Sequence, residues 1–316
     1  MDVRVSVGHE AEPFEIFVDR DVVLTIGVFD GVHLGHQHLI GQVVSRAKEL
    51  GCLSGAMTFD KHPQAVLRGQ VGPIYLTTVA EKMALLQNQG IDIRLLLHFD
   101  RQVADLTARQ FISRLCQRVK LRELWVGPDF ALGRRREGTV ALLQNIGGEQ
   151  GFTVHTVPPM QVDGQVVSSS LIRQKLMAGD VRAAARLLGR FPRLTGEVVE
   201  GARRGRTIGF PTANVDVPRD IVLPADGVYA VCAHLGDRTY EGVTNIGVRP
   251  SFDNGQRTIE AHLLDFDVDI YGQVLSLEFI DRLRGETRFD SVEGLVCQIK
   301  RDVAQAQEVL RAAPCR

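Results

Sequence analysis

The chain has 316 residues, of which 44% are hydrophobic and 24% charged, and its formal net charge is −1. This length and composition allow two globular domains, and the balanced charge gives no basis for electrostatic binding to nucleic acids or anionic membranes. We expect no secretory signal in the acidic first fifteen residues and no membrane span, since no stretch approaches ~20 apolar residues.

Five cysteines lie scattered at positions 52, 116, 232, 297 and 315, without a C-x-x-C pair. This odd and dispersed set predicts reduced thiols in a cytoplasmic protein. It argues against a disulfide framework and against a thiolate metal site.

Strand-like and helix-like segments alternate over the first 188 residues. Apolar runs predict strands at 22–28, 53–59, 91–99, 123–126 and 153–157. Two capping boxes, Thr78-x-x-Glu81 and Thr107-x-x-Gln110, predict the starts of helices. Strands that are buried beneath helices on both faces predict an α/β domain with a doubly wound parallel sheet.

The turn at 27–36 reads GVFDGVHLGH and joins the first strand to a helix at 36–50. Such a glycine-rich turn directs backbone N–H groups and the positive end of a helix dipole at a ligand. His33 and His36 share one side of the helix start and suit a polyphosphate. A surface pair and a metal site with His38 are the alternatives, although no carboxylate or cysteine completes a zinc set. Asp30 either shapes the turn or orients a histidine.

Further polar residues follow later strands and helix starts. Ser169, Ser170 and Arg173, in the run SSSLIR at 168–173, either cap a helix or bind phosphate. Asp129 and His62 follow predicted strands, at the sheet edge where ligands of such folds bind. The arginines at 134–136 are either a solvated loop or a screen for phosphates.

The pattern changes near residue 188. Short strand-like runs at 196–199, 228–234, 259–264 and 274–279 alternate with Gly, Pro and Asn, which predicts an antiparallel barrel or sandwich. A final helix is predicted at 291–311, with an apolar stripe formed by Val292, Leu295, Val296, Ile299, Val303 and Leu310.

Two motifs of this second half carry candidate chemistry. The run GARRGRTIGFPTAN at 201–214 combines glycines with three arginines, and Thr212 and Asn214 are hard oxygen donors suited to Mg²⁺ beside a nucleotide phosphate. A simple turn is the alternative for the last four residues. Alternation along a strand puts Glu260 on one face with Thr258 and His262, where it is either solvated or catalytic.

The order of these motifs resembles one family. GVFDGVHLGH resembles the HxGH motif of the nucleotidyltransferase superfamily, and 168–173 resembles its second phosphate-binding motif. The run at 201–214 resembles that of riboflavin kinases, and runs at 226–230, 245–250, 260–266 and 283–289 follow in that family's order. The chain thus resembles bacterial bifunctional riboflavin kinase/FAD synthetases from about residue 22 to the last helix.

The resemblance implies an FMN adenylyltransferase (FAD synthetase) domain at 1–188 and a riboflavin kinase domain at 189–316. The second would be a six-stranded antiparallel barrel with a C-terminal helix. The kinase makes FMN from riboflavin and ATP, and the adenylyltransferase joins FMN to the AMP part of ATP and releases pyrophosphate. Both reactions would need Mg²⁺, with riboflavin, FMN and ATP as small-molecule partners, and the oligomeric state stays open.

The resemblance also implies roles for individual residues. ATP phosphates and the leaving pyrophosphate would be held by His33, His36, Ser169, Ser170 and Arg173. The remaining adenylyltransferase contacts would be Gly27, Phe29, Asp30 and Gly35 for ATP, and His62 and Asp129 for the flavin. The kinase contacts would be Gly205, Thr212 and Asn214 for ATP and metal, Glu260 as base, and Arg284 and Phe289 for the flavin.

Two positions depart from the family pattern: Lys61 replaces a usual proline, and Leu132 replaces a usual aromatic residue. Three alternatives to two active modules stay open. The first is an enzyme with one active module, in which the synthetase is slow. The second is a flavin-binding regulatory protein without turnover. The third is a nucleotidyltransferase that acts on another phosphate.

Overall fold

The computed structural model describes residues 3–6, 17–69, 72–201, 205, 208–248 and 257–315. Most of the N-terminal segment and three arginines of the glycine-rich run, Arg203, Arg204 and Arg206, lie outside the described residues. The chain forms two compact units, one of residues 1–72 and 78–168, the other of residues 73–77 and 169–316. The predicted functional division at residue 188 stays a prediction.

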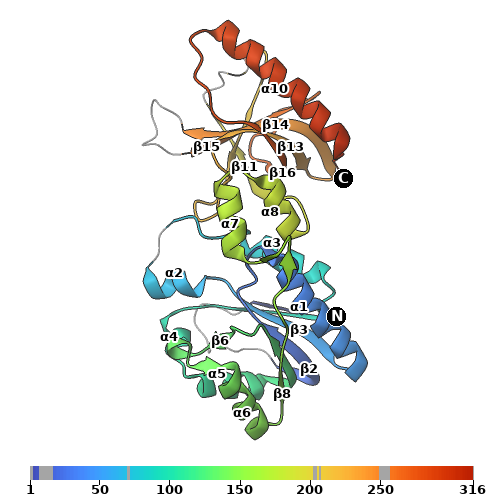
Figure 1. The fold of residues 1–316 in the computed structure, drawn as a ribbon, viewed down its shortest axis with the longest axis vertical. Coiled ribbons are helices and arrows are strands. Elements are labelled where there is room, and N and C mark those ends of the chain that lie inside the picture. The colour runs from blue at the N-terminus through green and yellow to red at the C-terminus, as the bar shows by residue number, and fades with distance from the viewer. Residues whose placement is uncertain are drawn as a thin grey trace. The chain divides into compact units, whose positions relative to one another are not determined.

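A six-stranded parallel sheet forms the centre of the first unit (Figure 1). Its order is β1 (Val3–Ser6), β4 (Ile93–Leu97), β3 (Leu53–Phe59), β2 (Val18–Ile26), β5 (Val119–Val126) and β8 (Thr153–Thr156). The chain passes from β2 to β3 and β4 on one side and then returns to β5 on the other. The strand order therefore reverses beside β2, where ligands bind in such sheets.

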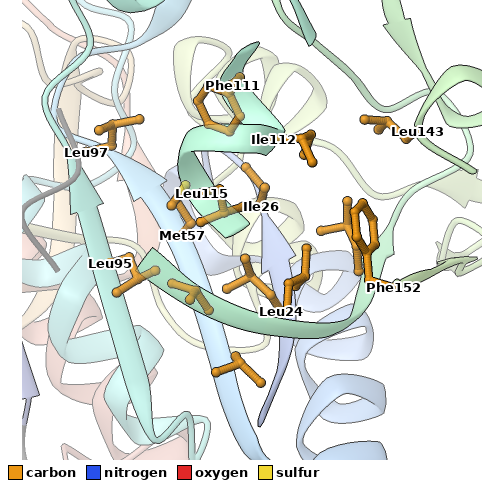
Figure 2. Close-up of a cluster of buried hydrophobic side chains, with 14 of the residues drawn as sticks. Leu24, Ile26, Met57, Leu95, Leu97, Phe111, Ile112, Leu115, Leu143 and Phe152 are labelled. Carbon is orange, nitrogen blue, oxygen red and sulfur yellow. The ribbon is translucent and has the colours of Figure 1, made fainter. Parts of the chain in front are cut away.

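Helices cover both faces of this sheet, as predicted. The helices are α1 (Leu34–Leu50) and α3 (Val79–Asn88) on one face, and α5 (Ala108–Arg118) and α6 (Val140–Gln150) on the other. Figure 2 shows Phe111, Ile112 and Leu115 of α5 packed against Leu24 and Ile26 of β2. Both predicted capping boxes are present, at the starts of α3 and α5.

Short elements connect these layers. They are η1 (Asp30–Val32), α2 (Pro63–Arg68), α4 (Arg101–Ala104), β6 (Ala131–Leu132), η2 (Arg134–Arg136), β7 (Gly138–Thr139), β9 (Gln161–Val162) and β10 (Gln165–Val166). Two of them, η1 and α2, follow directly after the sheet strands β2 and β3. They therefore lie at the carboxyl edge of the sheet.

The second unit begins with two helices and continues as a closed antiparallel barrel. The helices are α7 (Ser169–Met177) and α8 (Val181–Leu188). The barrel order is β11 (Arg193–Val199), β12 (Ala213–Asp216), β15 (Arg257–Leu263), β14 (Arg238–Val248), β13 (Gly227–Leu235) and β16 (Val274–Arg284). The barrel confirms the six-stranded prediction and excludes the sandwich.

The last helix, α10 (Val292–Ala312), packs against β13, β14 and β16. Ala306 and Leu310 contact the outward-facing residues Val228, Ala230 and Cys232 of β13. One face of β13 therefore lines the barrel and the other is covered by the helix, so seven consecutive residues of this strand are buried.

The predicted apolar stripe of this helix is partly wrong. Val292 is 57% exposed, whereas Asp302, which the stripe omitted, is 2% exposed. The buried residues of the helix are Asp302, Ala306 and Leu310, at the spacing of successive helical turns.

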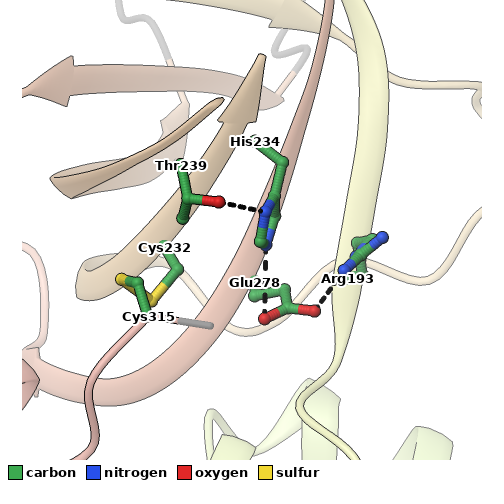
Figure 3. Close-up of a disulfide and its surroundings, with 6 residues drawn as sticks. All are labelled: Arg193, Cys232, His234, Thr239, Glu278 and Cys315. Carbon is green, nitrogen blue, oxygen red and sulfur yellow. Dashed lines mark hydrogen bonds and ion pairs between the residues drawn. A yellow bond between two sulfur atoms is a disulfide. The ribbon is translucent and has the colours of Figure 1, made fainter. Parts of the chain in front are cut away.

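A disulfide joins Cys232 on β13 to Cys315, just beyond α10, with Cα atoms 5.5 Å apart (Figure 3). The prediction of five reduced thiols is therefore wrong, although Cys52, Cys116 and Cys297 are free. The two bonded cysteines are separated by 83 residues, and only the packing of α10 along β13 brings them together. Cysteine spacing alone does not contain that information.

Candidate active sites

The turn after β2 has an unusual backbone. Phe29, Gly31 and Val32 all have positive φ values, of 50°, 78° and 37°. Glycine adopts this conformation readily, but a β-branched valine very rarely does. Such strain persists only where the surrounding structure holds it, and it concentrates at functional sites. The strained turn therefore coincides with the predicted phosphate site.

Two histidine rings stack at the end of this turn. His33 is the N-cap of α1, and its Nδ1 accepts a hydrogen bond of 3.2 Å from the backbone N–H of His36. A neutral His33 therefore carries its proton on Nε2. The His33 and His36 ring centroids are 3.6 Å apart with 15° between the planes, and Phe29 meets His36 edge-on at 5.2 Å.

His36 is held in its neutral form. Burial, followed by the nearby His33 and Lys82 charges, lowers the pKa of His36 well below its usual 6.5. Its Nδ1 is buried, and among the described residues it has no hydrogen-bond partner. A buried ring nitrogen without a partner, beside the positive end of the α1 dipole, is typical of a site that awaits a polar ligand.

Lys82 on α3 is a site residue that the sequence analysis missed. It is 5% exposed, and its Nζ donates to the carbonyl oxygens of Val28 at 3.2 Å and Phe59 at 2.7 Å. These carbonyls lie at the ends of β2 and β3, so the Lys82 ammonium group links the ends of these two strands. Burial lowers the pKa of Lys82 to about 8, although Asp30 and Asp60 act in the opposite direction. The sequence contained one indication that Lys82 is buried: it lies one helical turn before Leu86, on the same face of the predicted helix.

The Asp60 side chain connects the end of β3, which it follows, to the end of β4. Its Oδ1 accepts from the backbone N–H of Phe99 at 2.9 Å, and its Oδ2 lies 2.6 Å from His98 Nδ1. Burial would raise the pKa of Asp60, but these two partners outweigh it and lower the pKa. Lys82 and Asp60 together fix the ends of β2, β3 and β4 as one edge.

The other predicted residues of this site lie at the same edge. His62 follows β3 and caps α2, because its Nδ1 accepts from Gln64 N at 3.1 Å. Asp129 follows β5, is exposed, and accepts from Arg136 Nη2 through its backbone oxygen at 3.0 Å. The sheet order puts β3 and β5 on the two sides of β2, so both residues flank the histidine turn.

The two departures from the family pattern have different surroundings. Lys61 is exposed, and its backbone N–H donates to Asp60 Oδ1 at 2.6 Å. Leu132 on β6 packs against the hydrophobic core on the α5 and α6 face.

The predicted second phosphate motif begins α7. Ser169 is the first residue of this helix, Ser170 the second, and Arg173 lies one turn further on. All three belong to the second unit, whereas His33 and His36 belong to the first. Their assembly into one site therefore stays a prediction.

The barrel brings the predicted kinase residues together. On β15, Glu260 lies opposite Asn214 of β12 and, on the other side, opposite Asn245 of β14. Its neighbours Ile259 and Ala261 are buried while Glu260 is half-buried, as the predicted alternation requires. Strand pairing, rather than a loop, therefore sets the position of this carboxylate.

A cavity of about 790 Å³ opens in front of Glu260. Its lining includes Gly205, Thr212, Asn245, Arg284, Phe289 and Asp302. The Arg284 guanidinium carbon lies 5.8 Å from the centre of the Phe289 ring. Five of the six predicted kinase residues therefore share one concave site, namely Gly205, Thr212, Glu260, Arg284 and Phe289, whereas Asn214 is not among its lining residues.

A second cavity, of about 400 Å³, is also lined by Thr212. Its lining combines apolar residues, among them Leu263, Phe266, Ile270 and Tyr271, with the carboxylates of Asp267 and Asp269. The backbone of Gly201 lies so close to the Asn214 amide that a Cβ atom would overlap it. Thr212 thus stands at the boundary between two cavities, and Asn214 lies directly against Gly201.

In the described residues, neither a cluster of metal-ligating side chains nor a membrane-spanning helix is present. Among those residues no group of three or more His, Cys, Asp or Glu side chains is placed to hold a metal ion. The same part of the chain contains no helix long and apolar enough to cross a membrane.

Comparison with known families and relatives agrees with the two halves of the fold. The FAD synthetase model matches residues 16–171, and the riboflavin kinase model matches residues 188–310. A bifunctional riboflavin kinase/FMN adenylyltransferase of Pseudomonas fluorescens is 40% identical, covering 93% of this chain and 94% of the relative. Proteins of that name from Haemophilus influenzae (37% identical, 90% and 92% covered) and Bacillus subtilis (36%, 94% and 96%) are similar.

A solved structure gives the same result for the fold. It is described as a macrolide-efflux protein from Streptococcus pneumoniae, with a TM-score of 0.85 and 33% identity. It covers 93% of this chain, and this chain covers 96% of it. With both family models matched in order and relatives aligned along nearly the whole length, the chain belongs to the family of bifunctional riboflavin kinase/FMN adenylyltransferases.

Proposed function

We propose that the barrel phosphorylates riboflavin and that the parallel-sheet unit carries the turn that binds ATP for adenylyl transfer to FMN. The observation that supports the first assignment is the position of Glu260 between two asparagines, at the wall of a 790 Å³ cavity. The observation that supports the second is the strained turn with its stacked pair of histidines.

In the kinase reaction, Glu260 acts as the general base. The ribityl 5′-hydroxyl oxygen of riboflavin forms a bond to the γ-phosphorus of ATP while the bond to the ADP oxygen breaks. The hydroxyl proton passes to the Glu260 carboxylate. A positioned base of this kind contributes typically ~10²–10⁴-fold to the rate.

ATP-dependent kinases and adenylyltransferases generally use a divalent metal, and we assign Mg²⁺ to Thr212 and Asn214. Their hydroxyl and amide oxygens are hard donors, which suit Mg²⁺ when the nucleotide phosphates complete the set. The bound ion would neutralise charge on the transferred phosphate. The close approach of the Gly201 backbone holds the Asn214 amide in place for this role.

The second cavity suits the base of the nucleotide. Its apolar wall of Leu263, Phe266 and Tyr271 matches a flat heterocycle, and Thr212 connects it to the cavity of Glu260. The larger cavity, with Arg284 and Phe289, would then hold the flavin. Gly205 also lines the larger cavity. Because it has no side chain, it leaves room for the nucleotide phosphates between the flavin and the nucleotide base.

In the adenylyl transfer, the phosphate of FMN attacks the α-phosphorus of ATP and pyrophosphate leaves. No protein nucleophile is needed, because the FMN phosphate is already anionic. The chain has to position the two phosphates and stabilise the charge that develops on the leaving group. His33, His36 and the N-terminus of α1 supply donors for this purpose.

The remaining predicted contacts complete this assignment. We assign the pyrophosphate to Ser169, Ser170 and Arg173, and the flavin to His62 and Asp129. The rest of the ATP contacts fall on the turn, at Gly27, Phe29, Asp30 and Gly35. We also propose a cytoplasmic location, because both reactions consume ATP.

A two-step assay tests the proposal. The full chain is incubated with riboflavin, ATP and Mg²⁺, and the flavins are separated by chromatography. We expect FMN first and then FAD, with one pyrophosphate released per FAD. FMN without FAD would leave a single active module. Flavin binding without ATP consumption would indicate the regulatory protein instead.

A further inference from the structure

An ion pair between the half-buried Arg284 and the buried Asp302 lies at one wall of the kinase cavity. Arg284, the last residue of β16, donates from Nε to both carboxylate oxygens of Asp302 on α10, at 3.0 and 3.1 Å. Its Nη2 donates to Asp302 Oδ2 at 2.8 Å. Gln298, one turn earlier on α10, donates to Asp302 Oδ1 at 2.8 Å. The carboxylate therefore accepts hydrogen bonds from two residues.

Stability alone does not explain this pair. Asp302 is 2% exposed and occupies the helix face that otherwise buries apolar residues such as Ala306 and Leu310. The loss of hydration of two charges offsets much of their attraction, and well-packed apolar residues often serve as well or better. An aspartate at this position is therefore best explained by what it does to Arg284.

The hydrogen bonds of Arg284 fix its plane. A guanidinium group has five N–H donors in a rigid fork. The bonds to Asp302 use Nε–H and one Nη2–H, and Nη1 donates to Gly285 O at 2.9 Å and to Thr287 Oγ1 at 3.5 Å. Within the described residues, one Nη2–H is left without a partner. The Phe289 ring lies 5.8 Å from the guanidinium carbon.

The substrate proposed for this cavity has matching chemistry. Arg284, Asp302 and Phe289 line the same cavity as Glu260. The isoalloxazine ring of riboflavin is flat and carries carbonyl oxygens and ring nitrogens that accept hydrogen bonds. A guanidinium held in one plane recognises such a ring edge far better than a mobile one, because less side-chain freedom is lost on binding.

We propose that Asp302 is a positioning residue of the kinase, which holds the Arg284 guanidinium so that its remaining N–H donates to the isoalloxazine ring of riboflavin. Asp302 acts through Arg284 and does not contact the reacting atoms. The inference rests on the proposed kinase function of the barrel. It makes α10 part of the flavin site rather than only a cover for the barrel.

The expected effect falls on binding rather than on chemistry. In Asp302→Asn, the charge that orients Arg284 is lost, while Glu260, Thr212 and Asn214 are unchanged. We expect the KM for riboflavin to rise roughly tenfold, the amount expected when a hydrogen bond to a charged group is weakened. The kcat for FMN formation and the KM for ATP should change little, which is the pattern of lost uniform binding.

The experiment uses the full chain and two controls. FAD formation from added FMN, measured on the same preparation, reports whether the rest of the protein is intact. Asp281→Asn is the matched control, because Asp281 on β16 also pairs with an arginine, Arg182 at 2.9 Å, but does not line the cavity. A riboflavin KM in Asp302→Asn equal to that of wild type would overturn the proposal, and so would a loss confined to kcat.

A double-mutant cycle separates positioning from a general packing defect. If Asp302 acts through Arg284, its substitution should raise the riboflavin KM much less in an Arg284→Lys background than in wild type. Equal effects in both backgrounds would overturn the proposal. If Asp302→Asn does not fold, Gln298→Leu, which removes one hydrogen bond to the carboxylate, should raise the same KM by a smaller factor. An unchanged KM in that variant would also overturn it.

These outcomes are distinguishable from failure of the proposed function. If the wild-type chain forms no FMN, the kinase assignment itself is wrong. If it forms FMN and the Asp302 and Gln298 variants keep the riboflavin KM of wild type, only the positioning role is wrong.

Discussion

Glu260 and Asn214 lie directly opposite each other on β15 and β12, the two strands of the barrel that carry the proposed base and the proposed metal ligand. Backbone pairing fixes their separation, so neither residue depends on a loop for its placement. Asn245 of β14 lies opposite Glu260 on its other side. A rigid arrangement of this kind is what a positioned base requires.

The first prediction concerns that base. Glu260→Gln keeps the size of the side chain but removes its ability to accept a proton. We expect FMN formation to fall by ~10²–10⁴-fold and FAD formation from added FMN to stay nearly unchanged. Glu241→Gln, the same change on the neighbouring strand β14 and outside both cavities, should affect neither step. Loss of both activities in a folded Glu260 variant would contradict the division of labour.

The second prediction is the reverse case. His36→Ala removes one imidazole from the strained turn, and we expect FAD formation to fall by about 10²-fold, as when one preorganised donor is lost. FMN formation should not change. His38→Ala, an exposed position on the same helix, is the control and should leave both rates intact. A His36 variant with normal FAD formation would remove the histidine pair from the mechanism.

The third prediction concerns pH and Lys82. In the unfolded chain Lys82 keeps its proton up to about its usual pKa of 10.5, whereas in the folded protein the pKa is about 8. Between these values the unfolded state binds more protons, so the Lys82 contribution to the free energy of unfolding increases with pH. Below pH 8 that contribution is smallest, because the charged amine is then buried.

Lys82→Met tests this relation. Trp125 is the chain's only tryptophan and lies on β5, so its fluorescence reports the unfolding of the first unit in urea. The free energy of unfolding of wild type, minus that of the variant, should grow from pH 8 toward pH 10. Lys48→Met, at an exposed site on α1, is the control for the loss of a surface lysine. A constant difference for Lys82→Met would mean that the amine is not held at a lowered pKa.

The fourth prediction concerns the Cys232–Cys315 bond. A cross-link between residues 83 apart restricts the unfolded chain, and its loss should destabilise the barrel unit by roughly 2–5 kcal/mol. Cys315→Ser and reduction by dithiothreitol should lower its melting temperature alike, whereas Cys297→Ser, a free and exposed thiol on α10, should not. Thiol titration of the denatured, unreduced chain should find three thiols, and five after reduction. Five before reduction would contradict the bond.

The sequence predicts those features of the fold that depend on local pattern. The run at 53–59 matches β3 residue for residue, and the capping boxes at Thr78 and Thr107 begin helices as expected. The side of the strand on which Glu260 lies also follows from simple alternation. In each case neighbouring residues alone contain the information.

Features that depend on distant partners were not predicted. Strand β14 contains two glycines and several polar residues, and it becomes a strand because β13 and β15 pair with it on both sides. Lys82 is buried because carbonyl oxygens from two other segments receive its ammonium group. Asp302 lies on an otherwise apolar face of α10, and it is buried there because Arg284 donates hydrogen bonds to its carboxylate. Apart from β13 and β15, which are the neighbours of β14 along the chain, these partners lie far away in sequence.

The bond between Cys232 and Cys315 has a topological consequence. It turns the stretch between them into a covalent ring, which includes Glu260, Arg284 and Asp302. A protease that cuts once inside this ring cannot release a fragment, because the two pieces remain attached through sulfur. A single cut should therefore leave the band unshortened on a denaturing gel without reductant and split it in two when reductant is added.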